Sequence, residues 1–261
     1  MTNSAVDQRL RVRQLAVTVA AVFCVFGTLV GTGVIGTRVA ESSGGDLAAD
    51  ATLIAPAGPA FSIWSVIYLG LGAYTLWQWR TANAATERHR RTAWLAALSM
   101  VLNATWLLVT QVGWLAVSVV VIIALLVTCA MIVDRLTQEP PRGRLELAVV
   151  DGTFGLYLGW VCVAVCANIA ATLVAWGVPA TGVVPTVLTV VVLAAVVVVA
   201  ARLGRVFGGN WFVAAGIAWG LAWVAVARLT DRPQSMVLGF AAIAAAVAVL
   251  LVTRQARERR R

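Results

Sequence analysis

The sequence predicts an all-α integral membrane protein with eight membrane-spanning helices. Apolar residues make up 61% of the 261 residues and charged residues only 12%, which is too little polar surface to cover a water-soluble globule. Apolar stretches of roughly 20 residues, the length that crosses a bilayer, recur between arginine, glycine and proline residues. The predicted spans are residues 15–36, 60–79, 92–111, 114–133, 147–175, 184–203, 210–227 and 235–253.

Two of these spans need separate justification. The first, residues 15–36, is longer than the core of a signal peptide and no small-residue cleavage site follows it, so we interpret it as a membrane helix. The third and fourth are separated only by Gln111, Val112 and Gly113. An unbroken helix over residues 92–133 would be about twice as long as a bilayer requires, which favours a tight reversal at this point.

The distribution of charge predicts the orientation. Every basic residue is an arginine, and with eight spans only Arg38, Arg228 and Arg232 fall on the opposite side from the others. The positive-inside rule therefore places both termini in the cytoplasm. The net charge of +9 is explained by arginines at helix ends that meet anionic lipid, so we expect membrane lipids as partners and no nucleic acid.

The residues typical of metal and acid–base sites are sparse. Four cysteines, Cys24, Cys129, Cys162 and Cys166, lie within predicted spans, where cysteine behaves as a small apolar residue. The only histidine, His89, is predicted to lie in a cytoplasmic loop. Because no catalytic triad, facing carboxylate pair or Cys/His cluster is present, we expect neither an enzyme nor a metal site, and no required cofactor.

Three predicted helices carry aromatic and polar side chains on one face. Helical spacings of three and four group the members of each set, and the fifth span holds its four within an arc of roughly 80°. All three faces reach the same half of the bilayer, beneath the loop of residues 37–58. The nine candidate ligand-binding residues are Phe61, Trp64 and Tyr68, then Asn103 and Trp106, then Tyr157, Trp160, Ala164 and Asn168.

Each of these residues also has an ordinary structural interpretation. Tryptophan and tyrosine form belts at membrane interfaces, and intramembrane asparagines join helices. We assign Trp77, Trp79, Trp94, Trp114, Trp176 and Trp211 to such a belt. For Trp64 or Asn103 taken alone, packing is the stronger hypothesis, and the combination of three faces is what favours a pocket.

The motifs Phe61-Ser-Ile-Trp64, Asn103-Ala-Thr-Trp106 and Tyr157-Leu-Gly-Trp160, in this order, resemble those of the translocator protein (TspO, tryptophan-rich sensory protein) family. The resemblance covers residues 15–175, the family's five-helix unit. It implies a receptor or carrier, in a bacterial-type cell membrane, that binds porphyrin, haem or sterol-like ligands in a pocket lined by eight of the nine candidates, all except Tyr68. The sequence departs at Leu156, where the family has proline, so a kink is either absent or supplied by Gly155 and Gly159.

The resemblance divides the chain into a five-helix unit, residues 1–176, and three additional helices with a basic tail, residues 177–261. Residues 187–200 are almost all valine, alanine and leucine, which predicts a lipid-facing or space-filling helix. Three glycine pairs have the spacing that permits close helix contact, either within the chain or in a homodimer. These pairs are Gly27 with Gly31, Gly155 with Gly159, and Gly216 with Gly220. Trp219 and Trp223 share a face and either pack or extend the pocket.

Asp151 is the acidic residue placed clearly inside a span. It lies nine residues before Trp160 and so on the opposite helix face, which favours a structural pairing with Arg144 or Arg91 over a proton relay. The alternatives to a receptor or carrier of a flat hydrophobic ligand are a proton-coupled transporter and a membrane enzyme that degrades a bound porphyrin.

Overall fold

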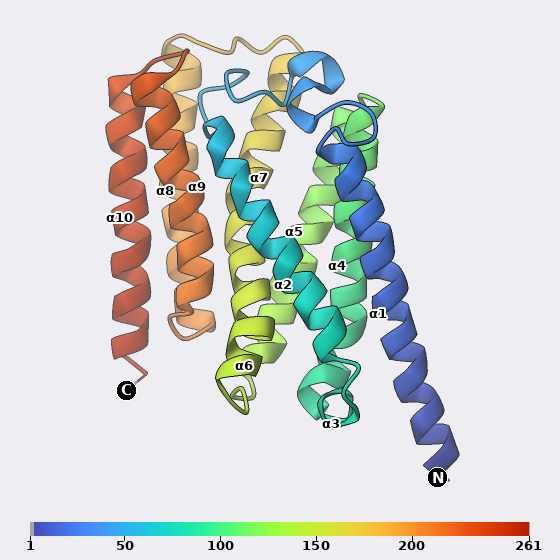
Figure 1. Cartoon of the computed structure of the whole chain (residues 1–261). Helices are drawn as coiled ribbons and strands as arrows, with labels where there is room; N and C mark the ends of the chain where they lie inside the picture. Colours follow the sequence, from blue (N-terminus) through green and yellow to red (C-terminus); the bar gives the residue numbers. More distant parts are fainter. Residues whose placement is uncertain (1–2, 261) are drawn as a thin grey trace.

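The structure, a computed structural model that describes residues 3–260, is a bundle of long helices that run between the same two ends (Figure 1). The eight long helices are α1 (Asn3–Gly31), α2 (Ile63–Trp77), α4 (Glu87–Gln111), α5 (Leu115–Thr137), α7 (Thr153–Ala175), α8 (Val183–Val206), α9 (Trp211–Thr230) and α10 (Met236–Glu258). Short helical pieces are α3 (Thr81–Ala84), α6 (Arg144–Glu146), and the 3-10 turns Val39–Glu41, Ser43–Gly45 and Gly58–Ser62. No strand occurs in the described residues.

Eight helices are long and apolar enough to cross a membrane, which confirms the predicted all-α fold and the number of spans. One boundary was misplaced: α4 begins at Glu87, so His89 lies in the helix and not in a loop. The cause is an N-cap that the sequence analysis overlooked, because the Thr86 hydroxyl accepts a hydrogen bond from the His89 backbone N–H at 3.2 Å.

Both termini lie at one end of the bundle, which we call the terminal end, and the loop of residues 37–58 lies at the other, the loop end (Figure 1). The tight reversal predicted between the third and fourth spans is present, since α4 ends at Gln111 and α5 begins at Leu115. Gly113 supplies the turn with a φ of 73°, a conformation that side chains other than glycine rarely adopt. The cytoplasmic location of the termini stays a prediction.

The long helices pack side by side in the order α1, α4, α5, α7, α9, α10 and α8, and α2 crosses in front of the middle of this row and contacts α1 and α7 (Figure 1). The last three helices therefore meet the first five mainly where α9 packs on α7. In α8 the buried residues are limited to Thr189, Leu193, Val196, Ala200 and Gly204, so most of its valines face outward. This outward face fits the predicted lipid-facing helix.

The three predicted glycine pairs all form contacts within the chain. The closest contact joins α7 to α9: a Cβ added to Gly159 would lie 2.2 Å from the Val213 carbonyl oxygen and 2.9 Å from the Gly216 Cα. In the same way, a Cβ on Gly27 would lie 2.7 Å from the Cα of Ala104, which brings α1 against α4. The kink proposed for Gly155 and Gly159 is absent, because both lie in the regular helix α7.

The irregularity occurs one turn earlier. Residues Leu147–Gly152 form a π-helical stretch that joins α6 to α7. Asp151 lies in it, and its partner is Arg88 of α4, at 2.5 Å, rather than Arg144 or Arg91 as predicted. The sequence analysis missed Arg88 because it placed this residue in a loop ahead of the helix.

Arg88 is the centre of a buried polar cluster at the terminal end. It is 4% exposed and also pairs with Glu146, at 3.2 Å, and donates hydrogen bonds to the carbonyl oxygens of Leu136 and Glu139. One guanidinium group thus joins α4, α5 and the π-helical segment. Because this cluster compensates the burial of two carboxylates, it is a structural element of the bundle.

We expect Gly159→Ala to lower the free energy of unfolding by about 1–3 kcal/mol, because the new methyl group overlaps the α9 backbone. The midpoint of thermal unfolding in detergent measures this effect. Gly72→Ala is the matched control, since Gly72 lies in α2 with no atom within 4 Å of an added Cβ. Equal midpoints for the two variants would contradict the close α7–α9 contact.

We expect Arg88→Gln to lower the free energy of unfolding by about 3–5 kcal/mol, since it leaves the partly buried Asp151 without its cation and the buried Glu146 with Arg142 alone. Glu87→Gln should cost no more than about 1 kcal/mol, because the Glu87–Arg91 pair, at 3.0 Å, is exposed to solvent. Denaturant titration of the purified protein followed by circular dichroism compares the two. Similar losses in both variants would show that the Arg88 cluster is not a buried support.

Candidate ligand-binding site

The loop of residues 37–58 covers the loop end of the first five long helices and forms the roof of the candidate site. It contains short 3-10 turns and an extended stretch, and residues 52–57 are buried although they have no regular structure. Two of its residues, Ala49 and Ala57, form hydrogen bonds with α9. The Ala57 N–H donates to the Trp223 carbonyl at 3.1 Å, and beyond the roof the Trp219 Nε1–H donates to the Ala60 carbonyl at 2.9 Å.

Two adjoining cavities lie beneath this roof. The larger, of about 420 Å³, is bounded by α1, α2, α4 and the roof, and the smaller, of about 50 Å³, lies between α2, α4, α7 and the roof. The residues common to both are Val39, Ala49, Phe61, Trp64 and Trp106. The combined space is in the size range of pockets that hold small organic molecules.

The larger cavity exists because α1 and α2 meet only toward the terminal end. There Gln14 and Gln78 are paired: each side-chain amide donates to the other's backbone carbonyl, at 2.9 and 3.1 Å. Toward the loop end the two helices separate, and Thr28 of α1 and Thr32, just after this helix, face Ser65 and Tyr68 across the cavity. Ser65 and Thr32 are exposed, so this cavity opens at the side of the bundle.

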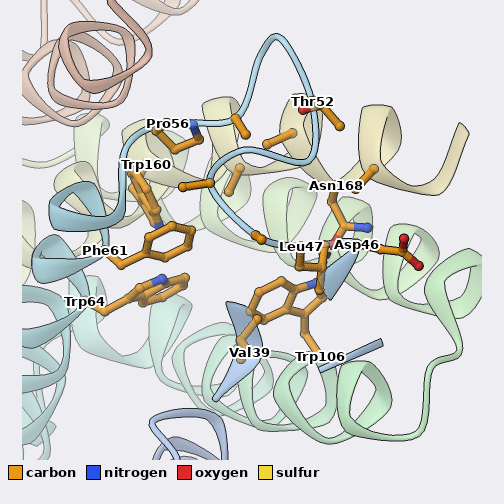
Figure 2. A pocket seen from close by; sticks show the side chains of 16 residues that line it. Val39, Asp46, Leu47, Thr52, Pro56, Phe61, Trp64, Trp106, Trp160 and Asn168 are labelled. Atoms are coloured by element: carbon orange, nitrogen blue, oxygen red, sulfur yellow. Dashed lines mark hydrogen bonds between the residues drawn. The ribbon is translucent and has the colours of Figure 1, made fainter. Parts of the chain in front are cut away.

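Aromatic rings form one wall of the site (Figure 2). Trp64 stacks on Tyr68 with a centroid distance of 5.4 Å, and meets Trp160 edge to face at 6.2 Å. Phe61 meets Trp160 edge to face at 5.7 Å. Such edge-to-face and offset arrangements are the preferred geometries of aromatic pairs, so this wall is ordered without a ligand.

The opposite wall is held by a hydrogen-bonded amide (Figure 2). The Trp106 Nε1–H donates to Asn168 Oδ1 at 2.7 Å, and the Asn168 amide donates to the Ser118 hydroxyl at 2.9 Å. Asn168 therefore joins α4, α5 and α7, which is the role expected of an intramembrane asparagine. Ala164 lies one turn before it and leaves the space that the smaller cavity occupies.

Seven of the nine predicted residues line these cavities, and two lie behind the wall. Asn103 is fully buried and donates to the Tyr68 hydroxyl at 3.3 Å. Tyr157 is also fully buried, donates to the Ser99 carbonyl at 3.3 Å and meets Trp64 edge to face. These two residues support Tyr68 and Trp64, and neither is on the cavity surface.

The cavities are mostly apolar, with few groups able to bind a polar substituent. Arg38 lines the larger cavity and Asp46 the smaller, and both belong to the roof. The indole N–H of Trp160, which is 1% exposed, has no hydrogen-bond partner. Within residues 3–260 no group of three His, Cys, Asp or Glu residues is placed to hold a metal ion.

The sequence analysis missed the contribution of the roof and of α1. Gly31 is buried against Leu107, and its neighbours Thr28 and Thr32 line the larger cavity. The sequence feature that could have indicated the contribution of α1 is the run of threonine and glycine at the end of the first span. Such a run is equally typical of helix packing. Roof residues such as Val39 and Ala49 carried no signal, because a loop conformation decides which of them face inward.

Most tryptophans of the predicted belt are exposed on the surface, whereas their position at a membrane interface stays a prediction. Trp79, Trp94, Trp114, Trp176 and Trp211 are exposed on the bundle surface. Trp77 is an exception, since it is only 9% exposed and stacks on Tyr74 with a centroid distance of 6.2 Å, close to His89. Trp219 and Trp223 line neither cavity, and their contacts to the segment 57–60 place them beside the roof.

The fold and the site define a class: a multi-pass helical membrane protein with an aromatic cavity beneath an ordered loop. The family described as TSPO-like protein matches residues 14–254, which is most of the chain. The protein belongs to this family. The match continues through α8, α9 and most of α10. Neither the curated proteins nor the solved structures include a significant match to the chain.

We expect Asn168→Ala to lower the free energy of unfolding by about 1–3 kcal/mol, because it leaves the buried Trp106 indole N–H without a partner and removes the link to Ser118, whose hydroxyl keeps only its bond to the Leu115 carbonyl. Thermal unfolding in detergent is the measurement. Thr105→Ala is the control, since the Thr105 hydroxyl bonds only to the Val101 carbonyl of its own helix. A loss no greater than in the control would mean that Asn168 is not needed for helix packing and is free for a ligand.

Proposed function

We propose that this protein is a membrane receptor or carrier that binds a flat hydrophobic ligand in the cavity beneath the roof, for sensing or transport. The observation that carries the proposal is the preformed aromatic wall of Phe61, Trp64 and Trp160 beside about 420 Å³ of space. Membership of the TSPO-like family supports ligand binding in a membrane. Rings of this kind stack on a planar conjugated ligand.

A tetrapyrrole, such as a porphyrin or haem, is the ligand class that we favour over a sterol. The larger cavity carries one cation, Arg38, which forms no ion pair with another residue of the described chain. An exposed guanidinium at the rim suits a carboxylate substituent, since arginine binds carboxylates in a bidentate manner. A sterol offers neither a conjugated face nor a carboxylate to these groups.

The two alternatives receive less support from the site. Proton-coupled transport would use an ionisable group at the cavity, but Asp151 pairs with Arg88 at the terminal end. Among the described helices, none contributes a carboxylate, arginine or histidine side chain to either cavity. Degradation of a bound porphyrin would have to use the tryptophans with a single carboxylate beside them, that of the roof residue Asp46, and among the lining residues no second acid–base group faces it.

The test is a titration of the purified protein with protoporphyrin, followed by the absorbance of the bound porphyrin. We expect saturable binding that Trp64→Ala weakens about tenfold, equivalent to about 1.4 kcal/mol, through loss of the stacking face. Arg38→Gln should weaken protoporphyrin binding to a similar degree and leave binding of its dimethyl ester unchanged.

Trp94→Ala is the matched control, because Trp94 is 54% exposed on the outer face of α4 and lies away from both cavities. Binding by the parent protein that is no tighter than that of an unrelated membrane protein would contradict the tetrapyrrole proposal. Equal effects of Trp64→Ala and Trp94→Ala would show that the porphyrin binds elsewhere.

A further inference from the structure

We propose that α9 holds the roof in place over the cavity, with Trp219 and Arg228 as positioning residues. The effect on a ligand rests on the proposed function, whereas the effect on the roof does not. This assigns a role to the last three helices: they fix the covering of a site that the first five helices form.

Helix α9 forms hydrogen bonds at three points along residues 49–60, two of them in the roof and one just after it. The Arg228 guanidinium donates to the Ala49 carbonyl at 3.5 Å, the Trp223 carbonyl accepts from Ala57, and the Trp219 indole donates to the Ala60 carbonyl. These points bracket some of the roof residues that line the smaller cavity, including Thr52 and Ala55. The contacted segment thus forms part of the lining of that cavity.

The roof depends on such external partners because it has little structure of its own. Buried backbone groups must find hydrogen-bond partners, and an extended loop cannot supply them internally. Residues 52–57 are buried, and Ala57 donates to α9 rather than to the loop. Without α9, the Ala57 N–H would have to be buried without a partner or the segment would have to move toward water.

Arg228 is a second, independent observation that α9 packs against the roof at the loop end. It is fully buried, yet it takes part in none of the ion pairs of the described residues. Its guanidinium instead donates to the carbonyl oxygens of Pro233, at 2.9 Å, and Ala49. A buried cation whose neighbours are carbonyl oxygens is strongly position-dependent, because a shift of those carbonyls would leave the charge uncompensated.

The position of α9 is itself fixed relative to the aromatic wall of the cavity. Gly216 packs against Gly159, and Trp160, the next residue of α7, forms part of the aromatic wall. The distance between the wall and the roof is therefore set through one rigid helix that contacts both. Displacing α9 would therefore change the distance between the aromatic wall and the roof.

The test is the rate at which a water-soluble maleimide labels a cysteine placed in the roof. Thr52→Cys suits this purpose because Thr52 is 3% exposed and lines both the smaller cavity and the neighbouring cavity between α7 and α8. The background carries Cys166→Ala, because Cys166 is the partly exposed native cysteine. The labelling rate then measures how often the roof moves away from the bundle and exposes the cysteine at position 52 to solvent.

Two variants remove one contact each. Trp219→Phe deletes the indole donor, and Ala57→Pro deletes a backbone donor at a residue whose φ of −57° already suits proline. We expect each to raise the labelling rate about fivefold, the factor that corresponds to one lost hydrogen bond. Trp211→Phe is the control, since Trp211 is similarly exposed but lies at the terminal end of α9.

The same variants are tested for the rate of protoporphyrin dissociation, which we expect to rise by a similar factor. The midpoint of thermal unfolding is measured in parallel, so that general loosening of the bundle is recognised. Labelling rates in both variants equal to that of Trp211→Phe would overturn the proposal. If the parent protein binds no protoporphyrin, the proposed function fails, and the labelling rates still decide whether α9 holds the roof.

Discussion

The contact between Gly159 and Gly216 is the constraint on which the rest of the structure depends. At this point the α7 and α9 backbones are so close that neither position has room for a methyl group. Without water to drive apolar association, helices in a bilayer are held by close packing of this kind and by interhelical hydrogen bonds. The contact turns α7 so that Trp160 and Asn168 face the cavity, and it brings α9 beneath the roof.

The same lack of water explains why the buried polar side chains pair with one another. Asn168 bonds to Trp106 and Ser118, Asn103 to Tyr68, and Arg88 to two carboxylates, so each of these side chains has at least one polar partner in the bundle. Two systems result, an ion cluster at the terminal end and an amide network at the loop end. Of these two systems only the amide network touches the cavity, so the buried ion cluster and the cavity lie toward opposite ends of the bundle.

Much of the fold was predictable from the sequence, because it depends on quantities that a sequence states directly. Length and hydropathy gave the eight helices, and helical periodicity gave the three faces that meet at the cavity. The errors lie where tertiary contact decides the outcome. Arg88 and His89 were placed in a loop because charge dominates their segment, although the Thr86 cap and the carboxylates of a later segment draw them into helix α4. Likewise, Asn103 and Trp106 are three residues apart on one helix, but only the second reaches the cavity, and periodicity cannot resolve that difference.

The roof shows the clearest limit of such prediction, and it also explains why the last three helices belong to the site. Nothing in residues 37–58 specifies a covering for a cavity, since the segment is rich in alanine, glycine and other small residues and has no aromatic residue. Its conformation is defined by Trp219, Trp223 and Arg228, which lie more than 150 residues later in the chain. A five-helix unit alone would leave these loop groups without partners. The family match that runs from residue 14 to residue 254 includes α9, the helix whose hydrogen bonds reach Ala49, Ala57 and Ala60.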